Sequence, residues 1–130
     1  MPILQHAGHM HYLAGDQPRI SDGAHPAELA RRYPEARLIC GHIRGGADRG
    51  GWGDLPPNDL IEISRMDSVL ANEIGPLIAN LGADRVVFGT GMPSNVPDPT
   101  LLKMEVLAAT EAEKEKIYGR NVARLLREEV

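Results

Sequence analysis

The chain has 130 residues with 42% hydrophobic and 25% charged content, which is ordinary for one globular domain that can bury a core. Its net charge of −4 provides no basic surface for nucleic acid, and no apolar run reaches the ~20 residues that cross a bilayer. The N-terminus lacks the basic and apolar regions of a signal peptide. We therefore expect a single domain over residues 1–130, in the cytoplasm, with neither nucleic acid nor membrane as a partner.

Short apolar runs alternate with helical patterns along the chain. Buried strands are predicted at residues 2–6, 37–42, 60–64 and 86–88. Helices are predicted at residues 26–32, 68–81, 99–109 and 111–127. The order of these elements predicts a parallel sheet with right-handed crossovers.

Three helix signals are specific enough to be tested individually. Gly82 is a natural stop for the helix over 68–81, and Thr110 with Glu113 has the spacing of a capping box. One face of the helix over 68–81 is predicted to be apolar, and it comprises Leu70, Ile74, Leu77, Ile78 and Leu81.

Histidines end the first two predicted strands, His6 the first and His42 the second. The carboxyl ends of parallel strands share one edge of a sheet, so we expect both histidines there, near Ser64 and the Thr90–Gly91 turn. Neutral imidazoles from neighbouring strands can converge on zinc or a related divalent ion. A hydrogen-bonded polar role is the alternative for each histidine.

The other histidines lie in less regular segments. His9 and His11 fall at i and i+2, on one side of the chain if the backbone is extended, and they are either metal ligands or loop and interface residues. His25 precedes a proline at a predicted helix start, which favours a surface position.

The carboxylates and the single cysteine favour mostly structural roles. Glu62 alternates with apolar residues and points either into a barrel interior or across to a helix. Asp67 is either an active-site group or a turn residue, Asp98 is predicted to start a helix, and residues 84–85 lie at the opposite end of their strand from the histidine edge. Cys40 lies in an apolar run and is predicted to be a core residue.

Four segments, in order, carry a resemblance to a known family. They are Gln5-His6-Ala7-Gly8, residues 30–42, residues 81–93 and the closing stretch 121–126. Together they resemble the C-terminal half of an amidohydrolase-related (β/α)8 TIM barrel, in the metal-dependent group that includes aminocarboxymuconate-semialdehyde decarboxylase. The resemblance implies an α/β fold of four parallel βα units, strands five to eight of the barrel, followed by a C-terminal helix.

The resemblance also implies a chemistry. It suggests a metal-dependent hydrolase-like protein that hydrolyses or decarboxylates a small carboxylated or cyclic substrate with a divalent metal, zinc being favoured. It makes His6 a metal ligand, and His42 either a ligand of a second metal or a catalytic residue. The family's His-x-His pair lies on strand one, so the resemblance assigns no role to His9 and His11, which remain candidate ligands from their spacing alone.

The chain departs from the family at Gly91 and in its length. Gly91 stands where the family has an aspartate that helps bind metal and activates water. A complete barrel takes about 250 residues, so about half is present and two open sheet edges are expected. We therefore expect a homodimer, or a separate chain that supplies the missing half. Activity is expected to be weakened or lost, and the alternative function is a non-catalytic oligomeric or ligand-binding module.

Overall fold

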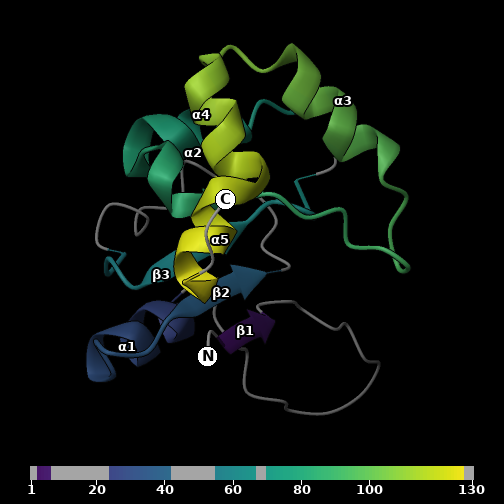
Figure 1. Cartoon of the computed structure of the whole chain (residues 1–130). Coiled ribbons are helices and arrows are strands. Elements are labelled where there is room, and N and C mark those ends of the chain that lie inside the picture. Colours follow the sequence, from purple (N-terminus) through teal and green to yellow (C-terminus); the bar gives the residue numbers. More distant parts are fainter. Residues whose placement is uncertain (1–2, 7–23, 42–54, 67–69, 128–130) are drawn as a thin grey trace.

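The computed structural model describes residues 3–6, 24–41, 55–66 and 70–127 (Figure 1). Its strands form one parallel sheet in chain order, made of β1 (Ile3–His6), β2 (Leu38–Gly41), β3 (Asp59–Glu62) and β4 (Val86–Val87). The predicted parallel α/β arrangement is thus confirmed, with strand boundaries that differ from the predicted ones by one or two residues.

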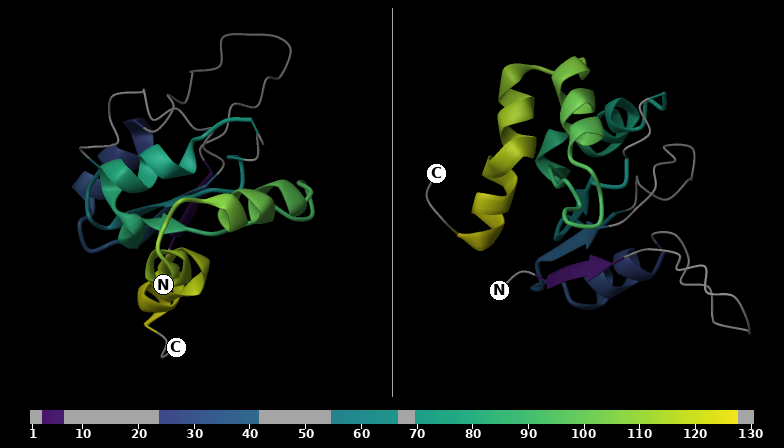
Figure 2. Two further views of the ribbon diagram at one scale, coloured as in Figure 1. Left: turned by 90° about the horizontal axis from the view of Figure 1, so that it is seen from above. Right: turned by 90° about the vertical axis from the view of Figure 1, so that its right-hand side faces the viewer.

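Helices lie on both faces of this sheet (Figure 2). They are α1 (Ala24–Arg32), α2 (Ile74–Leu81), α3 (Asp98–Val106), α4 (Glu111–Glu115) and α5 (Asn121–Leu126), with a 3-10 turn η2 (Ala83–Arg85) and a π-helical turn η3 (Lys116–Arg120). Within the part of the chain that the structure describes, no helix is long and apolar enough to span a membrane.

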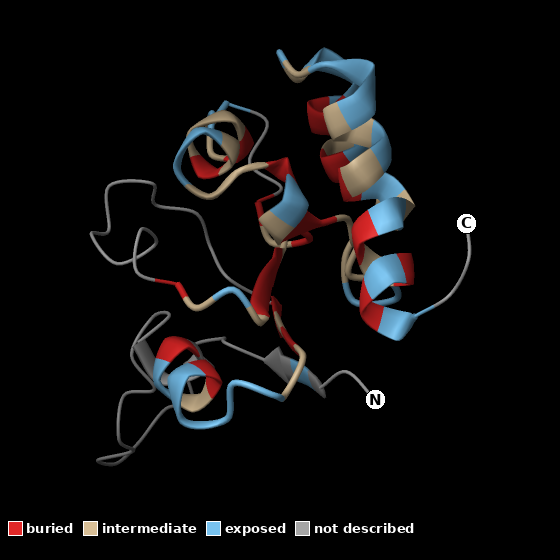
Figure 3. Cartoon of the chain, turned by 60° about the vertical axis from the view of Figure 1, so that its left-hand side comes forward, coloured by how far each residue is buried: buried red, intermediate tan, exposed pale blue. Residues whose placement is uncertain are grey.

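Alternation along the strands produces two apolar layers. One row, Cys40, Ile61 and Val86, packs with Ala27 of α1 and Leu77 of α2 in the main core. The neighbouring positions Leu60 and Val87 face the other way and pack against Leu125 of α5. In Figure 3 the buried residues accordingly line the central strands and the inner sides of the helices.

The second predicted helix was wrong over part of its length. Residues 70–73 are not helical, and α2 begins at Ile74. The reason is Pro76, which lacks an amide hydrogen and is tolerated only in the first turn of a helix. Leu70 is consequently 100% exposed and does not belong to the apolar face.

Two other helix predictions are confirmed. Gly82 ends α2 with φ 82°, and its amide donates to the carbonyl of Ile78. Thr110 and Glu113 form the capping box: Glu113 N donates to Thr110 Oγ1 at 3.3 Å, and Thr110 N donates to Glu113 Oε2 at 2.8 Å. The final helix is continuous from 111 to 126 but contains the π-helical turn in its middle.

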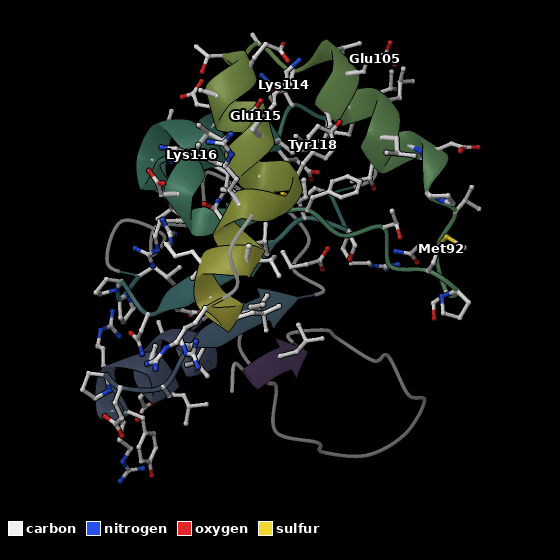
Figure 4. The ribbon with its side chains drawn as sticks, in the orientation of Figure 1. Met92, Glu105, Lys114, Glu115, Lys116 and Tyr118 are labelled. Atoms are coloured by element: carbon white, nitrogen blue, oxygen red, sulfur yellow. The ribbon has the colours of Figure 1, made fainter. Side chains whose placement is uncertain are left out.

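The outer edge of β4 is covered by this C-terminal helical run, so the prediction of two open edges was wrong for β4. Asn121 is 1% exposed, and its Nδ2 donates to the carbonyls of Ala83 and Val86, both at 2.7 Å. Phe88 N donates to Ile117 O at 2.9 Å. The Phe88 ring also packs 5.1 Å from the ring of Tyr118 in η3 (Figure 4).

Candidate functional site

The carboxyl ends of the strands meet at one edge of the sheet. The arrowheads of β1 and β2 point the same way in Figure 1, and Met92 marks the turn after β4 on that side in Figure 4. His6 is the last residue of β1 and pairs with Gly41, and Glu62 is the last residue of β3 and pairs with Val87. Cys40 pairs with Ile61, so one row runs His6, Gly41, Glu62, Val87. Gly41, the second residue of this row, has no side chain.

Glu62 presents a fixed carboxylate at this edge. Ser64 N donates to its Oε1 at 2.6 Å, and Ser64 Oγ donates to its Oε2 at 2.7 Å. Ser64 itself is 2% exposed, so both donors are held by the packed end of β3. Of the two directions expected for Glu62, the structure shows the one away from α1 and α2, against the turn after β4.

Gly89, in the turn after β4, is the residue that makes room for this carboxylate. A Cβ atom at Gly89 would collide with Glu62 Oε1 and would lie 2.7 Å from its Cδ, closer than real contacts allow. The carboxylate therefore crosses from β3 over the start of the turn that contains Gly91.

Asn95 fills the space beside Gly91. Gly91 has φ 69°, and a Cβ atom there would lie 2.7 Å from Asn95 Nδ2. Asn95 N donates to Gly91 O at 3.0 Å, and Asn95 Nδ2 donates to Ser64 O at 3.5 Å. Arg65 Nη1 donates to Asn95 Oδ1 at 3.2 Å, so one amide links the turns after β3 and β4.

Sequence reasoning missed both Asn95 and Arg65. They lie 30 positions apart, and no local pattern marks two loop residues that meet only when β3 and β4 pair. The one usable signal is positional, because both follow strand ends at the edge where function is expected.

The predicted ligands are only partly within the described residues. The backbone of His6 ends β1 as predicted, and His25 lies in α1. His9, His11, His42 and Asp67 lie outside the described residues, so their roles remain predictions. Among the residues that the structure describes, there is no group of three or more His, Cys, Asp or Glu side chains that could hold a metal ion.

The opposite end of the sheet is structural, as predicted for residues 84–85. Arg85 Nε donates to Asp59 O at 3.0 Å, and its Nη2 donates to the carbonyls of Leu55 and Pro56. Asp84 forms exposed ion pairs with Lys116 at 3.0 Å and with Arg124 at 3.3 Å. The hydrogen bond from Lys116 lowers the pKa of Asp84.

Cys40 and Asp98 also have their predicted structural roles. Cys40 is 1% exposed, and burial, together with the nearby Asp59 carboxylate, raises the pKa of its thiol to about 12. A thiol that stays protonated at neutral pH is a poor nucleophile and a poor ligand. Asp98 is the first residue of α3.

A hollow of about 300 Å³ lies between α3 and the segment before α2. It is lined mainly by apolar side chains, and Lys103 in its wall is paired with Glu73 at 3.3 Å. Because its one cation is already neutralised, this hollow is less suited to an anionic small molecule than the strand edge, where Arg65 lies.

The profile of a protein family described as amidohydrolase matches residues 3–127 of this sequence. The chain belongs to the amidohydrolase family. No curated protein matches the chain in sequence.

Three solved structures have a similar fold. One is 5-carboxyvanillate decarboxylase LigW from Sphingomonas paucimobilis, with 18% identity and a TM-score of 0.57, where the match covers 80% of this chain and 37% of that one. Another is amidohydrolase 2 from Bifidobacterium longum subsp. infantis, with 18% identity and a TM-score of 0.60, where the match covers 82% of this chain and 47% of that one. The third is a dihydroxybenzoic acid decarboxylase from Polaromonas with bound manganese and the inhibitor 2-nitroresorcinol, with 20% identity and a TM-score of 0.57, where the match covers 78% of this chain and 37% of that one. This chain thus spans less than half the length of each of these three proteins. At these identities the likeness shows the fold.

Proposed function

We propose that the chain supplies strands five to eight of a metal-dependent amidohydrolase barrel, which hydrolyses or decarboxylates a small carboxylated aromatic or cyclic substrate. The observation that carries this proposal is the row at the carboxyl edge, where His6, the side-chain-free position Gly41 and the fixed carboxylate of Glu62 follow one another across three strands. The similar decarboxylases support the substrate class, and the manganese in one of them supports a divalent ion.

The donors predicted for this edge would suit such an ion. Imidazole nitrogen from His6 and His42, with His9 and His11 as further candidates, and carboxylate oxygen together suit zinc or manganese. A bound divalent ion would lower the pKa of its water and polarise a carbonyl group. We favour zinc among the candidates, with His42 as the base if it is not itself a ligand.

The chain's own residues would orient the substrate. Arg65 places a guanidinium at the same edge, held through Nη1 by Asn95. A guanidinium binds carboxylates well, because its planar donors match the two carboxylate oxygens. A substrate carboxylate would therefore be drawn toward the turn after β3, next to the row of residues that starts at His6.

The remaining barrel strands would add at β1, which is one end of the sheet. For the barrel to close, the cover that Asn121 and Ile117 place over β4 would have to give way at the other end. We propose that a second copy or a separate chain extends the sheet at β1. Light scattering coupled to size separation tests this, and a stable compact monomer in dilute solution would contradict it.

Metal content tests the functional proposal directly. Protein purified without chelators should retain about one zinc, manganese or iron ion per chain, as measured by elemental analysis. His6→Ala should lose this metal, while His25→Ala, in α1, should keep it. Metal retention in His6→Ala equal to that of the unmodified chain would refute the assignment of His6.

A second candidate function has its own supporting observation. Asn95 occupies the space where the family's aspartate would project from position 91, which favours a ligand-binding module without catalysis. This alternative predicts binding of a carboxylated aromatic such as 2,6-dihydroxybenzoate with no retained metal and no release of carbon dioxide.

A further inference from the structure

The helix α3 lies at the periphery of the protein and has its more apolar side turned outward (Figure 1). The buried residues of this helix are Thr100, Lys103 and Met104. The outward side has three large apolar side chains, with exposed fractions of 42% for Leu101, 47% for Leu102 and 72% for Val106. A surface helix of a globular protein normally buries its apolar side, so the order is reversed in α3.

The outward side of α3 borders the hollow of about 300 Å³ that lies between α3 and the segment before α2. Val106, Leu107 and Ala108 line it at the end of α3, and Leu70, which is fully exposed, lines it from the other segment. An apolar cavity of about 150 Å³ already accepts a benzene ring, so the hollow has room for more than one aliphatic side chain.

We propose that a second copy of the chain docks on this surface about a two-fold axis. The surface, called the α3 face, consists of Leu70, Leu101, Leu102 and Val106 with the hollow beside them. A two-fold interface is formed by the same patch on both copies, so the patch has to be complementary to itself. The α3 face has both apolar side chains that project and an apolar hollow that can receive them. This contact is separate from the extension of the sheet at β1, and it depends on neither a metal ion nor the reaction.

The charges beside the α3 face suit a copy of the same chain. Glu105 is exposed on the outward side of α3, and Lys114 Nζ of α4 donates to Glu105 O at 3.1 Å (Figure 4). About a two-fold axis, the Glu105 carboxylate of each copy can face the Lys114 ammonium group of the other. The net charge of −4 opposes random association of copies, whereas this face has both signs of charge side by side.

Single exposed apolar residues are common on any protein surface and indicate no partner. The α3 face differs because its apolar residues are neighbours. Leu102 and Val106 lie one turn apart on the helix, and Val106 and Leu70 line the same hollow. Contiguous exposed apolar surface marks interaction sites in soluble proteins.

The test is the molar mass of the full chain in solution, measured by sedimentation equilibrium over a range of concentrations. Leu102→Glu places a charge in the α3 face and should raise the dimer dissociation constant by at least about thirtyfold, as expected for a central interface residue. Leu126→Glu is the matched control, because this leucine of α5 is 43% exposed, and it should dimerise as the unmodified chain does. Circular dichroism shows whether each variant is folded.

A pair of charge reversals gives an independent readout if Leu102→Glu does not fold. Glu105→Lys and Lys114→Glu each bring like charges together across the two-fold axis, so each variant alone should dimerise more weakly than the unmodified chain. An equal mixture of the two variants should regain the dimer, because opposite charges then face each other at both contacts.

The outcomes also separate the α3 face from the pairing of strands at β1. Loss of the dimer in Leu102→Glu alone, or its recovery in the charge-reversed mixture, supports the α3 face. A dimer that Leu4→Glu in β1 removes and Leu102→Glu leaves intact would place the contact at β1 and overturn the proposal. Equal weakening by Leu102→Glu and Leu126→Glu, or a monomer at every concentration of the unmodified chain, would overturn it as well.

Discussion

The two ends of the sheet use polar residues in different ways. At the amino end, the side chains of Arg85 and Asn121 bond to backbone carbonyls of the strands and turns they border. At the carboxyl end, Glu62 bonds to the amide and hydroxyl of Ser64, Asn95 bonds to Ser64 O and to Arg65, and Gly89 and Gly91 leave space beside them.

This difference separates residues that hold the fold from residues that are free for chemistry. Backbone carbonyls need partners wherever they are buried, so the side chains that satisfy them cannot be removed without cost. The Glu62 carboxylate also satisfies a backbone group, the amide of the buried Ser64, but each of its oxygens keeps a lone-pair site for a further partner. Barrel proteins show the same division, with stability at the amino ends and function at the carboxyl ends of the strands.

The largest effect is expected at the amino end, for Asn121→Ala. The variant would remove the Asn121 donor from the carbonyls of Ala83 and Val86, of which Ala83 O would keep only the amide of Val86, and should lower the free energy of unfolding by about 2 to 4 kcal/mol. Urea unfolding measures this. Asn80→Ala, on the exposed side of α2, is the control and should change stability by less than about 0.5 kcal/mol. If the two variants were equally stable, Asn121 would not be what fixes the edge of β4.

The next largest effect is expected for a substitution of Asp59, which should raise the free energy of unfolding at pH 7 instead of lowering it. This aspartate is fully buried, and neither carboxylate oxygen has a hydrogen-bond partner among the described residues. Burial raises its pKa from 3.8 to about 6, although the Arg85 guanidinium pulls the pKa down, and the protonated Cys40 lies close by. Between about pH 4 and 6 the folded chain therefore holds a proton that the unfolded chain has lost. Stability from this group is present at low pH and is lost as the pH rises through about 6.

Asp59→Asn removes this pH dependence. At pH 7 the variant should be more stable than the unmodified chain by about 1 to 3 kcal/mol, and at pH 4 the two should be equal. Unfolding curves at several pH values between 4 and 8 give the comparison. A stability difference that stays constant across this range would show that Asp59 does not titrate as its burial implies.

Local and periodic signals in the sequence were enough to predict the sheet and the common edge where its strands end. Alternating runs predicted the four strands, and Gly82 and the Thr110–Glu113 pair predicted helix ends that the structure confirms. The start of α2 differs from the predicted one although Pro76 marks it, because the apolar spacing extends the helical pattern back to residue 70.

The contacts that make up the site could not be predicted in the same way. Whether Glu62 meets Gly89, and Arg65 meets Asn95, depends on the register of β3 against β4, which no local pattern encodes. The cover over β4 likewise depends on Asn121, 35 positions after Val86, reaching back to that strand. The residues that lie at strand ends can therefore be predicted from the sequence more readily than the contacts that these residues make with other loops.

The smallest effect is expected for Asp84, the second aspartate at the amino end. Its ion pairs with Lys116 and Arg124 are exposed, with 52% of the aspartate side chain accessible, so water and salt screen them. Asp84→Asn should lower stability at pH 7 by less than about 1 kcal/mol, and the loss should disappear in about 1 M salt.

Because the folded pKa of Asp84 lies below its ordinary value, this contribution is present above pH 3.8 and fades as the pH falls through the folded pKa. The two aspartates thus respond to acid in opposite directions, and unfolding curves of both variants at pH 3, 5 and 7 test this. A salt-independent loss above 2 kcal/mol in Asp84→Asn would mean that exposed pairs, and not the buried contacts of Asn121 and Arg85, hold the amino end of the sheet together.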